Sequence, residues 1–285
     1  MVILGSKEYS GAPYFASISS LRVGADLSYV FTTNDASPII KSYSPEMIVL
    51  PILDNLEKNE AEMKTWLSRV HSLIIGPGLG RSEQAFKSVK IAVSLAKSQN
   101  IPIVVDADGL FILSHDLNQI SGYKKCILTP NLMEFKLLYD SCFKNEQEKY
   151  DEKLIHNTFE LQCDAVKKLA NKLSNVTIIK KGKCDIISNG NQLVFNDMEG
   201  SLKRCGGIGD ILTGTIGTFS YWSTLNKKET VNKNEISDYM IACYAASVFV
   251  KECSRIAFEK FHRSILAIDI IEQIAQTFYE MFDKN

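Results

Sequence analysis

A glycine-rich segment near the middle of the second half of this 285-residue sequence has the composition of a phosphate site. Residues 205–214 are Cys-Gly-Gly-Ile-Gly-Asp-Ile-Leu-Thr-Gly, and we expect a helix to begin there and to continue to about Trp222. Glycines let the backbone approach a ligand, and the free N–H groups at a helix start attract anions. Asp210 would lie beside such an anion, where a carboxylate can take the proton from an attacking hydroxyl. A tight turn in which Asp210 caps the helix explains the segment equally well.

A second segment, residues 129–134, combines an amide with a carboxylate directly after an apolar run. Its sequence is Thr-Pro-Asn-Leu-Met-Glu. Parallel sheets bind ligands at the carboxyl ends of their strands. Asn131 and Glu134 are three residues apart at a helix start, so both can face one site that suits hydrated Mg²⁺ held against phosphates. The local pattern slightly favours a capping box between the same two residues.

Three further segments carry weaker signals. Residues 76–80, Gly-Pro-Gly-Leu-Gly, suit a phosphate or ribose contact, but they match neither the Walker A sequence nor the dinucleotide fingerprint. Residues 105–109, Val-Asp-Ala-Asp-Gly, place carboxylates at a strand end or form a turn at Asp108 and Gly109. Residues 180–185, Lys-Lys-Gly-Lys-Cys-Asp, offer cations to phosphates, although a solvated turn is locally the better interpretation. The four histidines do not cluster, so a histidine metal site has no support.

The elements that would position these segments alternate between strand-like and helical patterns. Strands are predicted at the apolar runs 2–4, 27–32, 47–50, 72–75, 103–105, 126–129 and 176–180. Several of these runs lack the alternation of polar and apolar residues that is typical of a half-exposed sheet. Helical patterns occupy 12–23, 61–70, 83–99, 131–138 and 160–173. This order predicts an α/β protein with a doubly wound, mainly parallel sheet and helices on both faces. A hairpin of 185–188 with 192–195, and helices at 235–255 and 264–282, follow. Residues 143–158 are expected to form an exposed insertion or a helix extension.

The composition restricts the class of protein. Hydrophobic residues are 45% and charged residues 23% of the chain, and the formal net charge is −1, so neither nucleic acid nor an anionic membrane is an expected partner. No apolar run reaches 18 residues, and no signal or transit peptide is recognisable. The seven cysteines, without a Cys-x-x-Cys pair, suggest reduced thiols and a cytoplasmic protein.

Together and in this order, six segments resemble the ATP-dependent (S)-NAD(P)H-hydrate dehydratase family in its eukaryotic form. They are residues 11–15, Gly-Ala-Pro-Tyr-Phe, the segments at 76–81 and 105–110, residues 128–131 with Glu134, Lys181–Gly182 with Asp185, and residues 205–210. The resemblance extends to His-Arg-Ser at 262–264 and to residues 267–271. It implies a ribokinase-like fold over a single domain of residues 1–285, ATP as cosubstrate, Mg²⁺, and the S epimers of hydrated NADH and NADPH (NADHX and NADPHX) as substrates.

The resemblance also implies roles for individual residues. It implies Asp210 as the catalytic base, the backbone from Gly206 to Gly209 as an anion hole, and Glu134 as a residue that holds Mg²⁺ through water. The implied ATP contacts are Lys181, Gly182, Lys183, Cys184, Asp185, Gly200, Ser201, Leu202, Lys203, Arg204, Cys205, Gly206, Gly207, Ile208 and Gly209. The implied contacts of the hydrated dinucleotide are Gly80, Asn131, Leu132, Met133, Glu134, Phe135, Lys136, Leu137 and Asp210.

The chain departs from the family at its start, and two other functions compete with the implied one. The family has some tens of residues before this point, and Leu4 stands where a second glycine is usual, which predicts a shortened start and leaves a mitochondrial location open. A vitamin or thiazole kinase of the same fold would share Asp210, but not residues 11–15 with 76–81. A non-catalytic nucleotide-binding protein would have no need of an acid at Asp210. The sequence leaves a homo-oligomer open and does not distinguish NADHX from NADPHX.

Overall fold

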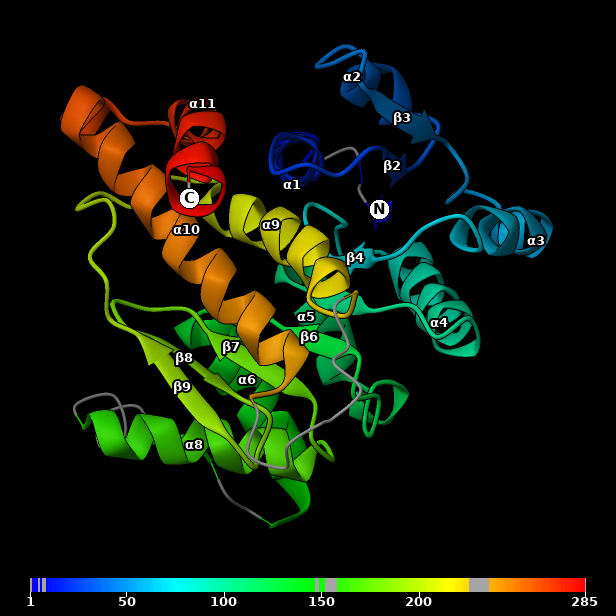
Figure 1. The fold of residues 1–285 in the computed structure, drawn as a ribbon. Coiled ribbons are helices and arrows are strands. Elements are labelled where there is room, and N and C mark those ends of the chain that lie inside the picture. The colour runs from blue at the N-terminus through cyan, green and yellow to red at the C-terminus, as the bar shows by residue number, and fades with distance from the viewer. Residues whose placement is uncertain are drawn as a thin grey trace.

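The computed structural model describes residues 2–4, 6, 9–146, 149–151, 158–225 and 236–284, and they form a layered α/β structure (Figure 1). One nine-stranded sheet has the order β3-β2-β1-β4-β5-β6-β7-β8-β9. Pairing is parallel from β3 to β7 and antiparallel at β8 and β9. The strands are β1 Val2–Leu4, β2 Ser28–Phe31, β3 Met47–Leu50, β4 Leu73–Ile75, β5 Ile103–Val105, β6 Cys126–Leu128, β7 Thr177–Lys180, β8 Asp185–Ser188 and β9 Leu193–Asn196.

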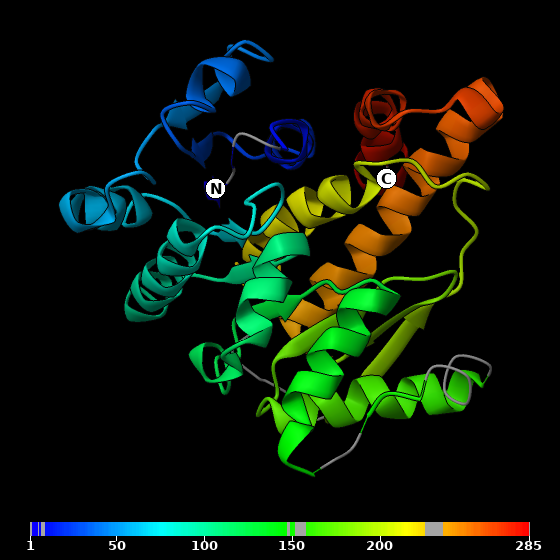
Figure 2. The ribbon, with the colours of Figure 1, turned by 180° about the vertical axis from the view of Figure 1, so that it is seen from behind.

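Helices cover both faces of the sheet. They are α1 Gly11–Arg22, α2 Ser37–Lys41, α3 Leu56–Leu67, α4 Glu83–Ser98, α5 Ala107–Ser114, α6 Leu132–Cys142, α8 Phe159–Lys172, α9 Ile208–Trp222, α10 Asp238–Phe261 and α11 Ala267–Phe278. Short turns of 3₁₀-helix lie at Leu117–Gln119, Lys144–Glu146 and His262–Ser264, and a π-helical turn lies at Tyr279–Asp283. Figure 1 shows α9 and α10 in front of the sheet, and Figure 2, from behind, shows α5 and α6 in front of it.

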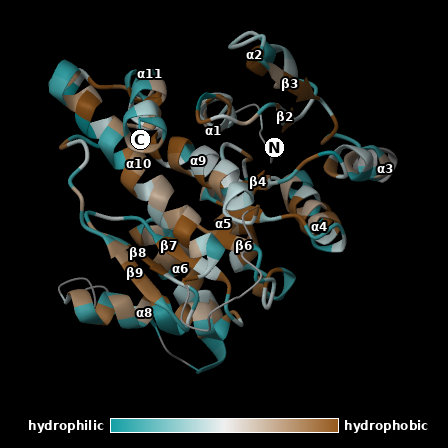
Figure 3. Ribbon diagram, viewed as in Figure 1, coloured by the Kyte–Doolittle hydropathy of each residue, from teal (hydrophilic) through white to brown (hydrophobic). Residues whose placement is uncertain are grey.

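The two faces of the sheet bury separate hydrophobic cores. Leu73 and Ile75 of β4 point to the core beneath α3, α4, α5, α6 and α8, whereas Ile74 points to the core beneath α1, α9, α10 and α11. Successive strand residues face opposite sides, so a strand buried on both faces must be apolar throughout. Figure 3 shows this as brown strands in the centre of the molecule. The predicted doubly wound, mainly parallel sheet is confirmed.

The structure corrects several predicted elements. Two helices were not expected: α2, which is only five residues long, and α5, where a turn at Asp108 and Gly109 had been one of two alternatives. The helix predicted at 61–70 is α3, which begins at Leu56 and ends at Leu67. The helices predicted at 235–255 and 264–282 are α10 and α11, and a 3₁₀ turn at His262–Ser264 lies between them. Residue 235 lies outside the described residues. None of the helices in the described ranges is long and apolar enough to cross a membrane.

The exposed insertion or helix extension predicted at 143–158 is confirmed at Lys144–Glu146, an exposed 3₁₀ turn, but it is wrong at two aromatic residues. Phe143 is 2% exposed and Tyr150 is 3% exposed, and both belong to the core beneath α6. Their aromatic rings pack against Tyr139, at centroid distances of 4.5 Å for Phe143 and 5.7 Å for Tyr150. The polar composition of the segment gave no indication that these two aromatic side chains are buried in the core. Residues 147–148 and 152–157 lie outside the described residues.

Candidate active site

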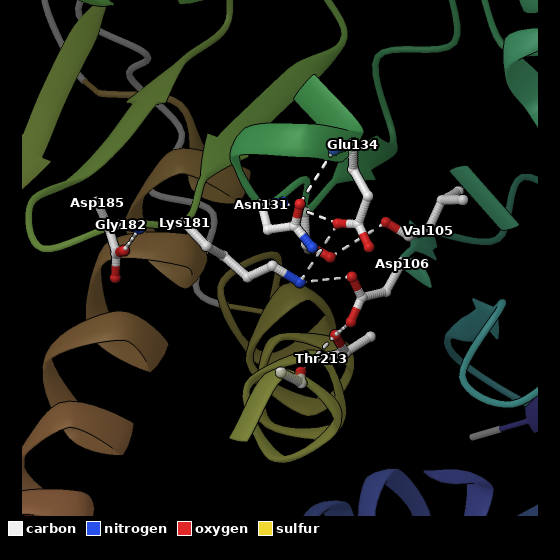
Figure 4. A network of polar contacts seen from close by, with 10 residues as sticks. Val105, Asp106, Asn131, Glu134, Lys181, Gly182, Asp185 and Thr213 are labelled. Carbon is white, nitrogen blue, oxygen red and sulfur yellow. Dashed lines mark hydrogen bonds and ion pairs between the residues drawn. The ribbon is translucent and has the colours of Figure 1, made fainter. Parts of the chain in front are cut away.

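Asp106 is the centre of a polar network at the carboxyl edge of the sheet (Figure 4). It follows β5 directly and is 2% exposed. Its Oδ1 lies 2.6 Å from Nζ of Lys181, the residue after β7, and its Oδ2 accepts a hydrogen bond of 2.7 Å from Oγ1 of Thr213 on α9. A buried carboxylate is stable only when it is paired and hydrogen-bonded in this way. Asp106 therefore fixes β5, β7 and α9 relative to one another.

Lys181 is the cation of this network. Its Nζ lies 2.6 Å from Asp106 and 4.0 Å from Oε2 of Glu134, and Figure 4 shows its side chain reaching between the two acids. Burial alone would lower the pKa of Lys181, but the neighbouring carboxylates of Asp106 and Glu134 raise it, so the amine stays charged. A Cβ on Gly209 would lie 3.4 Å from this Nζ. The ammonium group is therefore held against the backbone of the glycine segment.

Asp210 lies in the first turn of α9, partly buried beside the same charges. Burial, followed by the nearby carboxylates of Asp106 and Glu134, raises the pKa of Asp210 from 3.8 to about 8, against the opposing effect of Lys181. The N-cap of this helix is Gly207, which has no side chain to cap it. A carboxyl group with so high a pKa is a candidate for proton transfer near neutral pH.

The turn before α9 requires glycine at one position. Gly207 has a φ of +98°, in the left-handed region, and a Cβ there would lie 2.7 Å from Cβ of Ala267 and 2.9 Å from the ring of Phe15. Gly206, in contrast, has no atom within 4 Å of the position of a Cβ. The turn is thus pressed against α1 and α11 on one side and open on the other. Its open side and the N-terminus of α9 form a setting that favours an anion.

Glu134 and Asn131 form the capping box that the sequence locally favoured. The backbone N–H of Glu134 donates to Oδ1 of Asn131 at 3.0 Å, and the N–H of Asn131 donates to Oε2 of Glu134 at 2.8 Å. Burial, with the charges of Asp106 and Asp108, outweighs the effect of Lys181 and raises the pKa of Glu134. The capping box places the Glu134 carboxylate 4.0 Å from Lys181, so capping and a place in the site are compatible.

The other residues of α6 that the resemblance implied as substrate contacts lie in different environments. Met133 is 65% exposed, whereas Phe135 is fully buried in the core and makes an edge contact with Tyr150. Leu132, Lys136 and Leu137 are half-buried. The structure thus brings Asn131 and Glu134 to the network, and contacts of the remaining residues with a ligand stay predictions.

The solvated turn predicted at residues 180–185 is exposed at Gly182 and Lys183 but buried at both ends. Lys180 is 3% exposed and donates to Oε1 of Gln162 at 2.8 Å, and Asp185 is 5% exposed. Asp185 accepts hydrogen bonds from the amide of Gly182, at 2.8 Å, and from the hydroxyl of Ser247 on α10, at 2.6 Å. Lys180, Lys181 and Asp185 therefore bind neighbouring side chains and backbone, whereas Lys183 is exposed, and composition alone does not distinguish them.

The two segments expected to contact ATP converge on α10. Lys251 of α10 donates to the carbonyl of Lys183 at 2.8 Å, while Ser254, one turn later, accepts from the amide of Ser201 at 3.1 Å. A Cβ on Gly200 would lie only 2.7 Å from Oγ of the same Ser254. Leu202, Arg204 and Gly206 are exposed, and Lys183 is exposed at the facing turn. A ligand between these segments would meet both of them at once.

On the other side of the network, Gly80 and Asp108 meet. The amide of Gly80 donates to Oδ2 of Asp108 at 2.9 Å, and Nε of Arg81 lies 2.8 Å from Oδ1 of the same carboxylate. Asp108 lies in the first turn of α5, not in a turn of its own. Gly80 and Arg81 are also part of the lining of a cleft of about 630 Å³.

The donor set suits a magnesium ion carried by phosphates. Mg²⁺ keeps several waters and takes one or two protein carboxylates together with phosphate oxygens. Burial, and then the neighbouring carboxylates, raise the pKa values of Glu134 and Asp210, and a divalent cation nearby would favour their charged forms. Within the described ranges, no group of three or more His, Cys, Asp or Glu side chains is arranged to hold a metal ion by itself.

Two residues of the network were not predicted as site residues. Asp106 had been noticed only as one of two acids at a strand end, and Thr213 had not been considered. The signal for Asp106 was its position directly after an apolar strand. Thr213 is three residues after Asp210, so both lie on one face of α9. Neither signal distinguishes the two acids at 106 and 108 without the structure.

The chain is similar to one family of known proteins over most of its length. The family model for NAD(P)H-hydrate dehydratase matches residues 1–276. The chain is similar to the "ATP-dependent (S)-NAD(P)H-hydrate dehydratase" of Entamoeba histolytica, with 43% identity over all of this chain and 87% of the relative. It is also 41% identical to the protein of that name from Pongo abelii, over 99% of this chain and 82% of the relative.

Solved structures agree on the fold. A ribokinase-like superfamily protein of Enterococcus faecalis has a TM-score of 0.71 and 20% identity, over 98% of this chain and 86% of the other. The ADP/ATP-dependent NAD(P)H-hydrate dehydratase of Bacillus subtilis, co-crystallised with ATP and Mg²⁺, has a TM-score of 0.64 and 18% identity, over 98% and 88%. The fold of this chain is ribokinase-like.

Proposed function

This chain belongs to the NAD(P)H-hydrate dehydratase family, and from that premise we propose that it uses ATP to dehydrate (S)-NADHX and (S)-NADPHX to NADH and NADPH. The products would be the reduced dinucleotide, ADP and phosphate, which makes the protein a hydro-lyase that repairs nicotinamide nucleotides. The single-domain organisation over residues 1–285, a cytoplasmic location and a homo-oligomer remain predictions of the sequence.

The observation that carries the proposal is the setting of Asp210. It is a partly buried carboxyl group with a pKa raised to about 8, at a helix N-terminus that begins with the glycine turn around Gly207. A phosphoryl group at that turn would be next to the carboxylate. A hydroxyl substrate between the two would have a base and an electrophile on opposite sides, as phosphoryl transfer requires.

The chemistry that follows is a transfer and an elimination. Asp210 takes the proton of the hydroxyl on ring carbon 6 as the hydroxyl oxygen attacks the γ-phosphorus of ATP, and ADP leaves. The carbon–oxygen bond then breaks with phosphate as the leaving group, assisted by the lone pair of the ring nitrogen. Loss of a proton from carbon 5 places the remaining electron pair in the 5,6 double bond. Phosphorylation is useful because phosphate leaves more readily than hydroxide.

The residues around Asp210 would position and stabilise these steps. The amides from Gly206 to Gly209 would bind the transferred phosphoryl group, and Lys181 would offset its charge. Asp106 and Thr213 would hold Lys181 and α9 in register. Mg²⁺ bound to the phosphates would supply further charge neutralisation, with Glu134 holding it through water.

The direct test is to incubate the protein with ATP, Mg²⁺ and chemically hydrated NADH. We expect NADH absorbance to return and ADP to appear in equal amounts, only for the S epimer and only when ATP is present. The control is the same mixture without ATP.

The competing kinase function predicts a different outcome. A vitamin or thiazole kinase would form ADP with an alcohol such as a hydroxyethylthiazole or pyridoxine and would leave hydrated NADH unchanged. ATP binding without either reaction would indicate a nucleotide-binding protein. The comparison with a matched set of substrates thus separates the three functions.

A further inference from the structure

The cleft of about 630 Å³ next to Gly80 contains none of the residues to which phosphoryl transfer was assigned. Its lining comes from the segments that follow β1, β2, β3 and β4, from the start of α4 and from the first turn of α5. The polar side chains that matter below are those of Thr33, Asp35, Asp54, Arg81, Gln84 and Asp108. A hydrated dinucleotide has a large non-reacting half, and of the contacts implied for this substrate only Gly80 is part of the described lining.

One end of the cleft suits a pyrophosphate. Arg81 is fixed by Asp108 at 2.8 Å and by the ring of Phe111, whose centroid is 4.0 Å from the guanidinium carbon. A guanidinium held through Nε keeps its terminal N–H groups for phosphate oxygens. Helix α4 begins beside it with Ser82 as N-cap, and Gln84 lies in its first turn. A helix N-terminus next to an arginine is a favourable place for a phosphate.

The other end of the cleft is acidic. Asp35 follows β2 and Asp54 follows β3, and the amide of Asn34 donates to Oδ2 of Asp54, which holds the two segments together. Arg81 is the one basic side chain in the described lining. Oγ1 of Thr33, in the same lining, is buried without a hydrogen-bond partner in the described structure. Such a hydroxyl is costly to bury alone and is available to a polar ligand.

The order of the sheet sets the direction of a bound dinucleotide. Asp106 follows β5 and Asp35 follows β2, and the order β2-β1-β4-β5 separates them by three strand spacings of about 4.8 Å each. An extended dinucleotide spans such a distance. With its reacting ring at Asp210, its pyrophosphate would lie near Arg81 and its adenosine near the ends of β2 and β3.

We propose that this cleft binds the adenosine half of the hydrated dinucleotide and favours NADHX over NADPHX. The pyrophosphate lies at Arg81 and the start of α4, and the adenosine ribose lies at Asp35 and Asp54. A carboxylate accepts a hydrogen bond from a ribose 2′-hydroxyl, but it repels a 2′-phosphate. This inference rests on the proposed function, because that function supplies the substrate and its direction.

The test measures binding without turnover. The affinities of NADH and NADPH, the two reaction products, are measured by calorimetry for the wild-type protein and for Asp35→Asn and Asp54→Asn. We expect the wild type to bind NADH more tightly. Each variant should reduce the ratio of the NADH affinity to the NADPH affinity by roughly 3- to 10-fold, because NADPH should bind more tightly. Each substitution removes one partly solvated carboxylate that would repel the doubly charged 2′-phosphate.

The matched control is Asp26→Asn. Asp26 is exposed and precedes β2 at the opposite edge of the sheet, so its removal changes the net charge equally without touching the cleft. The preference of this control should equal that of the wild type. Raising the ionic strength should also narrow the wild-type preference, because salt screens repulsion between exposed charges.

The possible results separate this inference from the proposed function. Equal affinities in the wild type, a preference for NADPH, or equal effects of Asp26→Asn and Asp35→Asn would overturn it. If the preference behaves as expected but hydrated NADH is never converted, the cleft assignment stands and the dehydratase function fails.

Discussion

Replacement of Asp210 by Asn tests the catalytic base and the helix cap against each other, because the two roles predict stability changes of opposite sign. Asn keeps the size of the side chain and removes its charge. If Asp210 is the base, kcat should fall by about 10²- to 10⁴-fold. The affinity for ATP should stay within a few-fold or increase, because negative charge is removed next to the phosphates.

The effect on stability follows from the pKa. The pKa of Asp210 rises from 3.8 to about 8 on folding, so the folded protein binds the extra proton between these values and loses stability as pH rises through that window. Complete burial would make the cost above pH 8 roughly 6 kcal/mol. Asp210 is partly open to solvent, which screens the charge, and we expect about 1–3 kcal/mol. Asp210→Asn should therefore raise Tm at pH 9 by roughly 3–10 °C and change it little at pH 4.

The cap role predicts the reverse, and the chain contains a matched control for it. Asp269 occupies the third position of α11, as Asp210 does in α9, and its Oδ2 accepts the amide of Leu266 at 2.7 Å. Asp269→Asn should lower the free energy of unfolding by about 0.5–2 kcal/mol near neutral pH and should therefore lower Tm. Thermal scans across pH and steady-state kinetics of both variants decide the matter. Near-normal turnover of Asp210→Asn, or a loss of Tm like that of Asp269→Asn, would refute the base.

Three further variants test other parts of the site. Glu134→Gln, which keeps a capping side chain, should raise the Mg²⁺ concentration needed for half-maximal rate; an unchanged requirement would leave Glu134 as a capping residue only. Gly207→Ala should lower the free energy of unfolding by roughly 1–3 kcal/mol, and Tm with it. Gly206→Ala should change Tm by no more than about a degree or two, because its Cβ would meet no atom within 4 Å. Equal losses of Tm in the two variants would contradict the strained turn. Thr213→Val should reduce kcat more than Thr215→Val, whose hydroxyl bonds only to the carbonyl of Ile211 at 2.9 Å; equal kcat values would mean that the bond from Thr213 to Asp106 has no role in positioning.

The sequence predicted the sheet well because its information is local. Each of the seven parallel strands is a short apolar run, and the hairpin of β8 and β9 is bounded by Asn-Gly-Asn at 189–191. The elements it missed lack such a local pattern. Helix α5 begins with Ala-Asp-Gly, which resembles a turn, and it forms because Gly109 lets the helix approach the carbonyl of Ile75, 2.6 Å from where a Cβ would stand.

The candidate site depends on contacts between residues far apart in the chain, which the sequence could not supply. Asp106 and Lys181 are 75 residues apart, and Asp106 and Thr213 are 107 apart. Order along the chain identified the segments, but only the sheet order shows that β5 and β7 bring this acid and this lysine to one edge. The same contact explains why Lys181 is partly buried, although the composition of residues 180–185 favoured a solvated turn.

The charges of the network are unequal. Asp106, Glu134 and Asp210 surround Lys181, so three acids share one cation in a partly buried place. Burial is the main cause of the raised pKa values of Glu134 and Asp210, and the neighbouring acids raise them further. A metal ion on a phosphate would favour their charged forms and free the Asp210 carboxylate to accept a proton from substrate. The acid excess around Lys181 would in this way make the base active only when nucleotide and metal are both in place.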